Sequence, residues 1–167
     1  MLEFSLNHEI HCSAERFWAL FFDPGFTKKM IVDGLGFASC DIDDVRRDGN
    51  ESHRQMRVIP KLDIPAPVAK LLGPKLGYTE HGTFYEDEKV WDHRLELSVM
   101  SDRIRMGGKV RVQSAGEDRC RRIADLWCEA KIFGLGKMVE KAAEKNMRDG
   151  WSRSAAWIND WLKAHPE

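Results

Sequence analysis

The side chains best suited to chemistry in this sequence are Tyr78, Glu80 and His93, which fall on two neighbouring hairpin strands. The expected register puts all three on one face, with His93 as a diagonal neighbour of Glu80. A carboxylate buried away from water needs a partner. Three interpretations follow: a satisfied structural pair, a polar anchor for a ligand's hydroxyl or carboxylate, or a general base beside an acid. No nucleophile falls near His93, which weighs against the last. Asn146 and Arg153 lie at the margin of the same interior.

Other chemical motifs are weak. The six histidines lack metal-ligand spacing, so we expect no metal site and no cofactor. Gly134-Leu-Gly136 lacks the glycine spacing of a dinucleotide-binding loop. Arg119, Arg121 and Arg122 form a basic cluster too local for nucleic-acid binding, and a formal net charge of -1 gives no global field for such a partner.

The composition is that of an ordinary globular domain. The chain has 167 residues, 43% hydrophobic and 32% charged, which fits one domain spanning residues 1–167. No apolar run is long enough for a transmembrane helix, and the first residues resemble a strand rather than a signal peptide. The four cysteines form no CxxC pair and resemble small buried hydrophobes. We expect a cytoplasmic protein.

Several elements can position these side chains. Alternation predicts a first strand over residues 4–12, and Ser13 caps a helix over 14–22. A second short helix follows around 26–32, and period-two patterning begins at residue 37. Turns near residues 86–89 and 101–102 each place the same set on one face: Trp91, His93, Leu95, Leu97 and Val99. The last strand, over 124–132, leaves Trp127 outside unless a bulge shifts its phase.

The last quarter of the chain predicts one long amphipathic helix that starts at Gly134 and has about seven turns. Its apolar stripe consists of Val139, Ala143, Met147, Gly150, Ser154, Trp157, Ile158 and Trp161. Such a stripe needs a broad apolar partner. We therefore expect an α+β fold in the order β-α-α-β6-α, with a curved seven-stranded antiparallel sheet wrapped around the helix.

This order resembles the START-like (SRPBCC, helix-grip) superfamily, and more narrowly one of its uncharacterised bacterial members. The resemblance covers Phe4 to Leu162 and includes the Ser13-Ala-Glu-Arg-Phe-Trp opening of the first helix. The superfamily includes lipid-transfer domains, birch-pollen-type allergens, abscisic-acid receptors and polyketide cyclases. The resemblance implies a pocket between sheet and helix that holds a hydrophobic small molecule.

The expected pocket wall alternates large and small residues. Gly150 stands in the helix interior, where it costs about 1 kcal/mol relative to Ala; it allows either close packing or room for a ligand. The expected ligand-binding set is Tyr78, Glu80, Trp91, His93, Leu95, Leu97, Met106, Leu126, Met147, Gly150, Ser154 and Trp157.

The proline-rich segment 60–77 is too long and too apolar for a solvated loop. Its Ile64, Val68, Leu71 and Leu72 need cover, and residues 67–72 can form a short helix. We interpret it as a lid over the pocket, by analogy with the gate loop of abscisic-acid receptors. An ordinary packed insertion is the alternative. Its lysines suit weak, transient contact with an anionic membrane.

The sequence thus favours a non-catalytic carrier of a lipid or polyketide-like compound. One alternative is a cyclase, aromatase or hydrolase that uses His93 with Glu80. Another is a protein-interaction module with a filled core.

Overall fold

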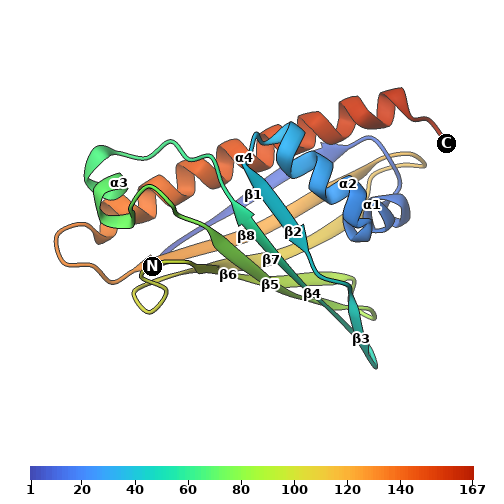
Figure 1. Ribbon diagram of the computed structural model, residues 1–167. Helices are drawn as coiled ribbons and strands as arrows, with labels where there is room; N and C mark the ends of the chain where they lie inside the picture. Colours follow the sequence, from blue (N-terminus) through green and yellow to red (C-terminus); the bar gives the residue numbers. More distant parts are fainter.

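An antiparallel sheet curves beneath one long C-terminal helix, α4 (Gly136–Ala164), in the computed structural model, which describes residues 1–167 (Figure 1). The eight strands have the order β1-β8-β7-β6-β5-β4-β2, and the short β3 pairs with β4. They are β1 (Leu2–Ile10), β2 (Ser39–Ile42), β3 (Arg46–Asp48), β4 (Glu51–Ile59), β5 (Tyr78–Tyr85), β6 (Val90–Leu97), β7 (Ile104–Ser114) and β8 (Cys120–Ala130). The expected α+β helix-grip architecture is confirmed.

The sheet has one strand more than the seven expected. The strand that begins after residue 37 breaks at residues 43–45 and resumes as β3. Both pieces pair with β4, so the break leaves the turn between β3 and β4 intact, with Gly49 at φ 58°. Glycine adopts this left-handed conformation without steric cost.

The hairpin registers decide which side chains face the helix. Between β5 and β6, the expected turn at residues 86–89 predicts the pairs Glu80–Leu95 and Gly82–His93, and both are present. Between β6 and β7, the expected turn at residues 101–102 would pair Leu97 with Met106. The prediction was wrong by two residues, because Leu95 pairs with Met106. The chain turns earlier there, with Met100 at φ 56°. A shift of two keeps every side chain on its expected face.

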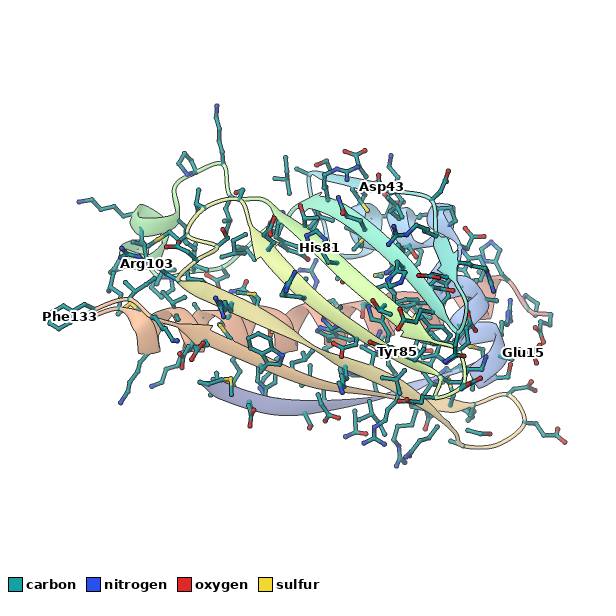
Figure 2. All side chains as sticks on the ribbon, turned by 90° about the horizontal axis from the view of Figure 1, so that it is seen from below. Glu15, Asp43, His81, Tyr85, Arg103 and Phe133 are labelled. Carbon is teal, nitrogen blue, oxygen red and sulfur yellow. The ribbon has the colours of Figure 1, made fainter.

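The outer face of the sheet is polar and is seen in Figure 2, where His81 and Tyr85 lie on the side away from α4. Trp127 also lies on this outer face without a bulge, since the β7–β8 register is continuous. It covers Gly107, the residue directly opposite: a Cβ there would lie 3.3 Å from the indole.

Three short helical segments follow β1 and close one end of the sheet (Figure 1). Ser13 accepts a hydrogen bond from the Arg16 amide at 3.1 Å and caps α1 (Ala14–Phe22). Asp23 then caps α2 (Pro24–Lys29), which continues into the π-helical turn η1 (Met30–Gly34). Gly34 allows close approach to α4, because a Cβ there would lie 2.9 Å from the Trp157 ring.

The proline-rich segment carries a helix, α3 (Ala66–Leu72), near the N-terminal end of α4 (Figure 1). It ends at Gly73, which has φ 80°. Val68 and Leu72 are buried in a cluster with Leu97, Met106 and Val139. No helix of this fold is long and apolar enough to cross a membrane. All four cysteines are buried and free.

Candidate functional site

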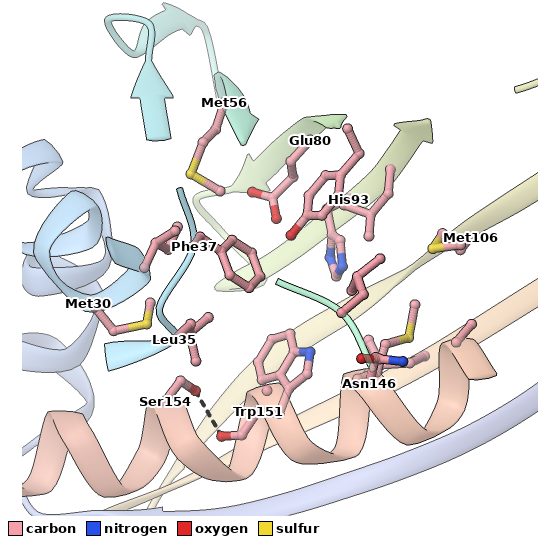
Figure 3. A pocket seen from close by; sticks show the side chains of 18 of the residues that line it. Met30, Leu35, Phe37, Met56, Glu80, His93, Met106, Asn146, Trp151 and Ser154 are labelled. Atoms are coloured by element: carbon pink, nitrogen blue, oxygen red, sulfur yellow. Dashed lines mark hydrogen bonds between the residues drawn. The ribbon is translucent and has the colours of Figure 1, made fainter. Parts of the chain in front are cut away.

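A cavity of about 250 Å³ lies between the concave face of the sheet and α4. Of its 35 lining residues, 27 are hydrophobic. Figure 3 shows Glu80 and His93 projecting from the sheet side, with Asn146, Trp151 and Ser154 opposite them on the helix. An engineered apolar cavity of about 150 Å³ is enough to hold benzene. The interior of this fold is therefore hollow on the scale of a small ligand.

Most of the residues expected at the pocket wall line this cavity: Tyr78, Glu80, His93, Leu95, Leu97, Met106, Leu126, Met147, Gly150 and Ser154. Trp91 and Trp157 do not. Trp91 is 1% exposed, and its indole fills the space beside Gly82. Trp157 packs on Phe26 and Gly34 instead. From the lid set, Ile64, Val68 and Leu72 line the cavity and Leu71 does not.

Glu80 is paired with Arg54 rather than with His93, which corrects the expected pairing. Arg54 on β4 reaches Oε1 of Glu80 at 3.2 Å and donates a 2.7 Å hydrogen bond to the carbonyl oxygen of Phe21. Its guanidinium lies over the rings of Phe21 and Trp91, 4.4 and 4.9 Å from their centroids. Arg54 is buried and Glu80 is partly buried, with side-chain exposures of 4% and 16%. Glu80 thus already has a counter-ion.

His93 is buried and is neutral at pH 7. Burial lowers its pKa below the usual 6.5, although Glu80 and Asp92 act in the opposite direction. Its Nδ1 is buried without a hydrogen-bond partner. Nearby, burial and the charge of Glu80 raise the pKa of Tyr78, so its hydroxyl stays protonated. Both side chains line the cavity, where they can hydrogen-bond to a polar atom of a ligand.

Arg122 is a further polar residue of the cavity wall. It is absent from the expected ligand-binding set because the sequence places it in a basic cluster with Arg119 and Arg121. It is 4% exposed and reaches across to α4, donating to Oγ of Ser154 at 3.0 Å and to the carbonyl oxygen of Trp151 at 2.8 Å. Its position on β8 has the same parity as Ala124 and Leu126, which face inward. Strand alternation alone would have found it.

The glycines on the inward faces of the sheet and of α4 have different surroundings. A Cβ on Gly82 would lie 1.8 Å from the Trp91 ring, and one on Gly108 would lie 2.6 Å from Leu126. The space beside these two glycines is therefore filled by neighbours. A Cβ on Gly150 would meet nothing within 4 Å. Among these three, only Gly150 leaves room.

Asp63 ties the start of the proline-rich segment to α4. Its amide donates to Oδ1 of Asn146 at 2.9 Å, and Nδ2 of Asn146 donates back to its carbonyl oxygen at 2.8 Å. Lys145 forms an ion pair with the Asp63 carboxylate. Asn146 itself lines the cavity, whereas Arg153 is exposed. The residues before α3 are thereby pinned beside the cavity.

Residues 5–162 match the family described as "Protein of unknown function (DUF2505)". The chain belongs to this family. No curated protein matches the sequence.

Solved structures share the fold of this DUF2505 chain at low sequence identity. A START superfamily protein from Mycobacterium smegmatis is 18% identical, with a TM-score of 0.66 over 96% of this chain and 98% of that one. The Zhui aromatase/cyclase from Streptomyces sp. R1128 is 12% identical, with a TM-score of 0.63 over 99% and 96%. Norcoclaurine synthase from Thalictrum flavum, in complex with dopamine and hydroxybenzaldehyde, is 18% identical, with a TM-score of 0.56 over 99% and 90%. The START-like fold expected from the sequence is confirmed.

The DUF2505 chain brings no three His, Cys, Asp or Glu side chains together in a way that could hold a metal ion. Its cavity instead offers apolar walls, a neutral imidazole, a protonated phenol and two arginines. These groups can desolvate an apolar body and hydrogen-bond or charge-pair with a few polar atoms.

Proposed function

We propose that this chain binds a hydrophobic small molecule, lipid or polyketide-like, in the cavity between sheet and α4. The observation that carries the proposal is the hollow itself, about 250 Å³ with mostly hydrophobic walls. Well-packed interiors contain few voids larger than a water molecule. This void supports the carrier over the interaction module, which requires a filled core.

Apolar burial supplies part of the affinity. A ligand that buries about 200 Å² of apolar surface gains about 5 kcal/mol. Association costs a substantial part of this gain, so apolar contact alone gives weak binding. The remainder must come from polar groups of the wall. Tyr78, His93 and the Arg54–Glu80 pair would orient the ligand by hydrogen bonds to its oxygen atoms.

The segment 60–77 would act as the lid. Its Val68 and Leu72 are buried with Leu97 and Met106, and all four line the cavity. The hydrogen bonds between Asp63 and Asn146 would hold the lid closed. The lysines Lys61, Lys70 and Lys75 are exposed on it, which suits transient contact with an anionic membrane during exchange.

The lid can be tested by removal and by loosening. Deleting residues 66–73 should speed ligand exchange while the domain stays folded. An Asn146→Ala variant should speed exchange more modestly, as measured by stopped-flow release of N-phenylnaphthylamine. The exposed change Arg153→Ala on the same helix serves as a control. Global unfolding of the deletion variant would favour the packed-insertion interpretation.

Binding is tested on the purified chain. Native mass spectrometry should detect a co-purifying small molecule that organic extraction releases. The extracted protein should then take up N-phenylnaphthylamine with a saturable rise in fluorescence. A chain that arrives empty and also binds no such probe would contradict the proposal.

A second candidate is an enzyme of the cyclase, aromatase or hydrolase kind. The specific observation in its favour is the neutral His93 imidazole, whose buried Nδ1 has no protein partner. A neutral imidazole on the cavity wall can accept a proton from a bound substrate. Glu80 would not assist directly, because it is held by Arg54. A His93→Asn variant that keeps binding but abolishes turnover of a polyketide-like substrate would favour this candidate.

A further inference from the structure

Arg122 is a buried cation without a counter-ion. It is 4% exposed and lines the cavity. Its hydrogen-bond partners are Oγ of Ser154, the carbonyl oxygen of Trp151 and, at 3.5 Å, Nδ1 of His8. None of these is an anion. Trp151 also presents its ring 4.6 Å from the guanidinium carbon, which gives only a partial substitute for a negative charge.

Arg54, the other buried arginine of the cavity, has the counter-ion that Arg122 lacks. Arg54 has Glu80 beside it at 3.2 Å. Arg122 has no carboxylate within salt-bridge distance. Burial lowers its pKa to about 9, so it still carries its charge at pH 7. A buried charge is strongly unfavourable unless it is paired, so an anion that binds beside Arg122 would stabilise the fold.

The guanidinium also has unused hydrogen-bonding capacity. Arginine carries five N–H donors, and Nε of Arg122 is buried without an acceptor. The hydroxyl of Ser154, which now donates to the carbonyl oxygen of Trp151 at 2.8 Å, can rotate toward the cavity. A cationic fork and a hydroxyl side by side match the two oxygens of a carboxylate.

We propose that the ligand is an amphipathic carboxylic acid whose carboxylate pairs with Arg122 and Ser154. This inference rests on the proposed binding function and specifies its ligand class. The apolar body would lie along α4 beside Gly150 and Met147, toward Leu97 and the lid. From Ser154 back to Val139 the helix offers about 22 Å of cavity wall, enough for a chain or a small ring system.

The test compares decanoate with decanol, which share an apolar chain and differ in the head group. Competition against N-phenylnaphthylamine at pH 7 should show that the wild-type protein prefers decanoate at least tenfold. In Arg122→Met this preference should vanish while decanol still binds. Arg121→Met, an exposed neighbour on the same strand, should keep the preference, and Arg122→Lys should restore part of it.

Two outcomes distinguish failure of the carboxylate proposal from failure of the proposed binding function. If wild-type protein binds both compounds equally, the proposed carboxylate site at Arg122 is refuted, but binding of an apolar ligand in the cavity is supported. If it binds neither compound nor the probe, both proposals fall.

A second measurement needs no variant. Carbon NMR of carboxyl-labelled decanoate bound to wild-type protein should show a carboxyl pKa below that of free decanoate, because pairing with a cation favours the charged form. A bound carboxyl group that titrates at or above its free value would overturn the assignment.

Discussion

Gly150 provides a direct test of whether the space beside α4 is kept for a ligand. It lies in the middle of a 29-residue helix and lines the cavity. A Cβ added there meets no atom within 4 Å. Gly150→Ala should therefore introduce no clash, and Gly150→Leu should direct its side chain into the hollow.

The expected stability changes follow from helix propensity and burial. Alanine is about 0.8–1.0 kcal/mol more favourable than glycine in a helix interior. For a chain of this size, Gly150→Ala should raise the melting temperature by about 2–4 °C. Gly150→Leu should gain a similar propensity term, and its buried methyl groups should add to it as long as they fit the void.

Ligand binding should change in the opposite direction. Gly150→Leu occupies part of a cavity of about 250 Å³, so the affinity for N-phenylnaphthylamine should fall about tenfold or more. Ala156→Leu, an exposed position on the same helix, should leave binding unchanged. Urea denaturation measures the stability of each variant, and titration with N-phenylnaphthylamine measures its affinity. Loss of stability in Gly150→Ala, or full binding by a stable Gly150→Leu, would refute the reasoning.

Three other perturbations have predictable results. Gly82→Ala forces a Cβ to within 1.8 Å of the buried Trp91 ring and should cost about 3 kcal/mol or more in urea denaturation. Glu80→Ala strips Arg54 of its counter-ion and should cost about 3–5 kcal/mol, with Glu80→Gln costing less. His93 binds a proton more readily unfolded than folded, so acidification below pH 6.5 should remove stability by up to about 1.4 kcal/mol per pH unit. His93→Asn should lack this contribution. If the free energy of unfolding of the variant falls with pH as steeply as that of the wild type, the assignment to His93 is wrong.

The order of elements was predictable because each depends on local patterning. Alternation and turn residues located the strands, and two turns agreed on the inward face of β6. The β6–β7 register was mispredicted because the chain turns one residue earlier than expected. Met100 adopts a left-handed conformation there, which is uncommon for methionine and is not predicted from its residue type. The error left the site intact, since a shift of two residues preserves the faces.

The polar contacts inside the cavity were harder to predict. Glu80 was expected to use its neighbour on β6, but a longer side chain from β4, Arg54, reaches it first. Arg54 and His93 both pair with Gly82, so both are diagonal neighbours of Glu80, and the register alone does not decide which of them pairs with it. Arg122 was predictable from strand parity alone, but a cluster of arginines suggests surface charge unless the alternation of the strand is followed through it.

Three features of this interior lower the stability of the empty fold: an unfilled void, a glycine in the middle of a long helix, and a buried guanidinium without an anion. Random drift toward marginal stability would scatter such features over the molecule. Here Gly150 and Arg122 border the same cavity, and Ser154, one helical turn from Gly150, hydrogen-bonds to Arg122. A bound amphipathic acid would fill the void, pack on the glycine and neutralise the arginine together. One binding event would thus offset the cost of all three features, and their shared location supports the proposal of ligand binding over imperfect packing.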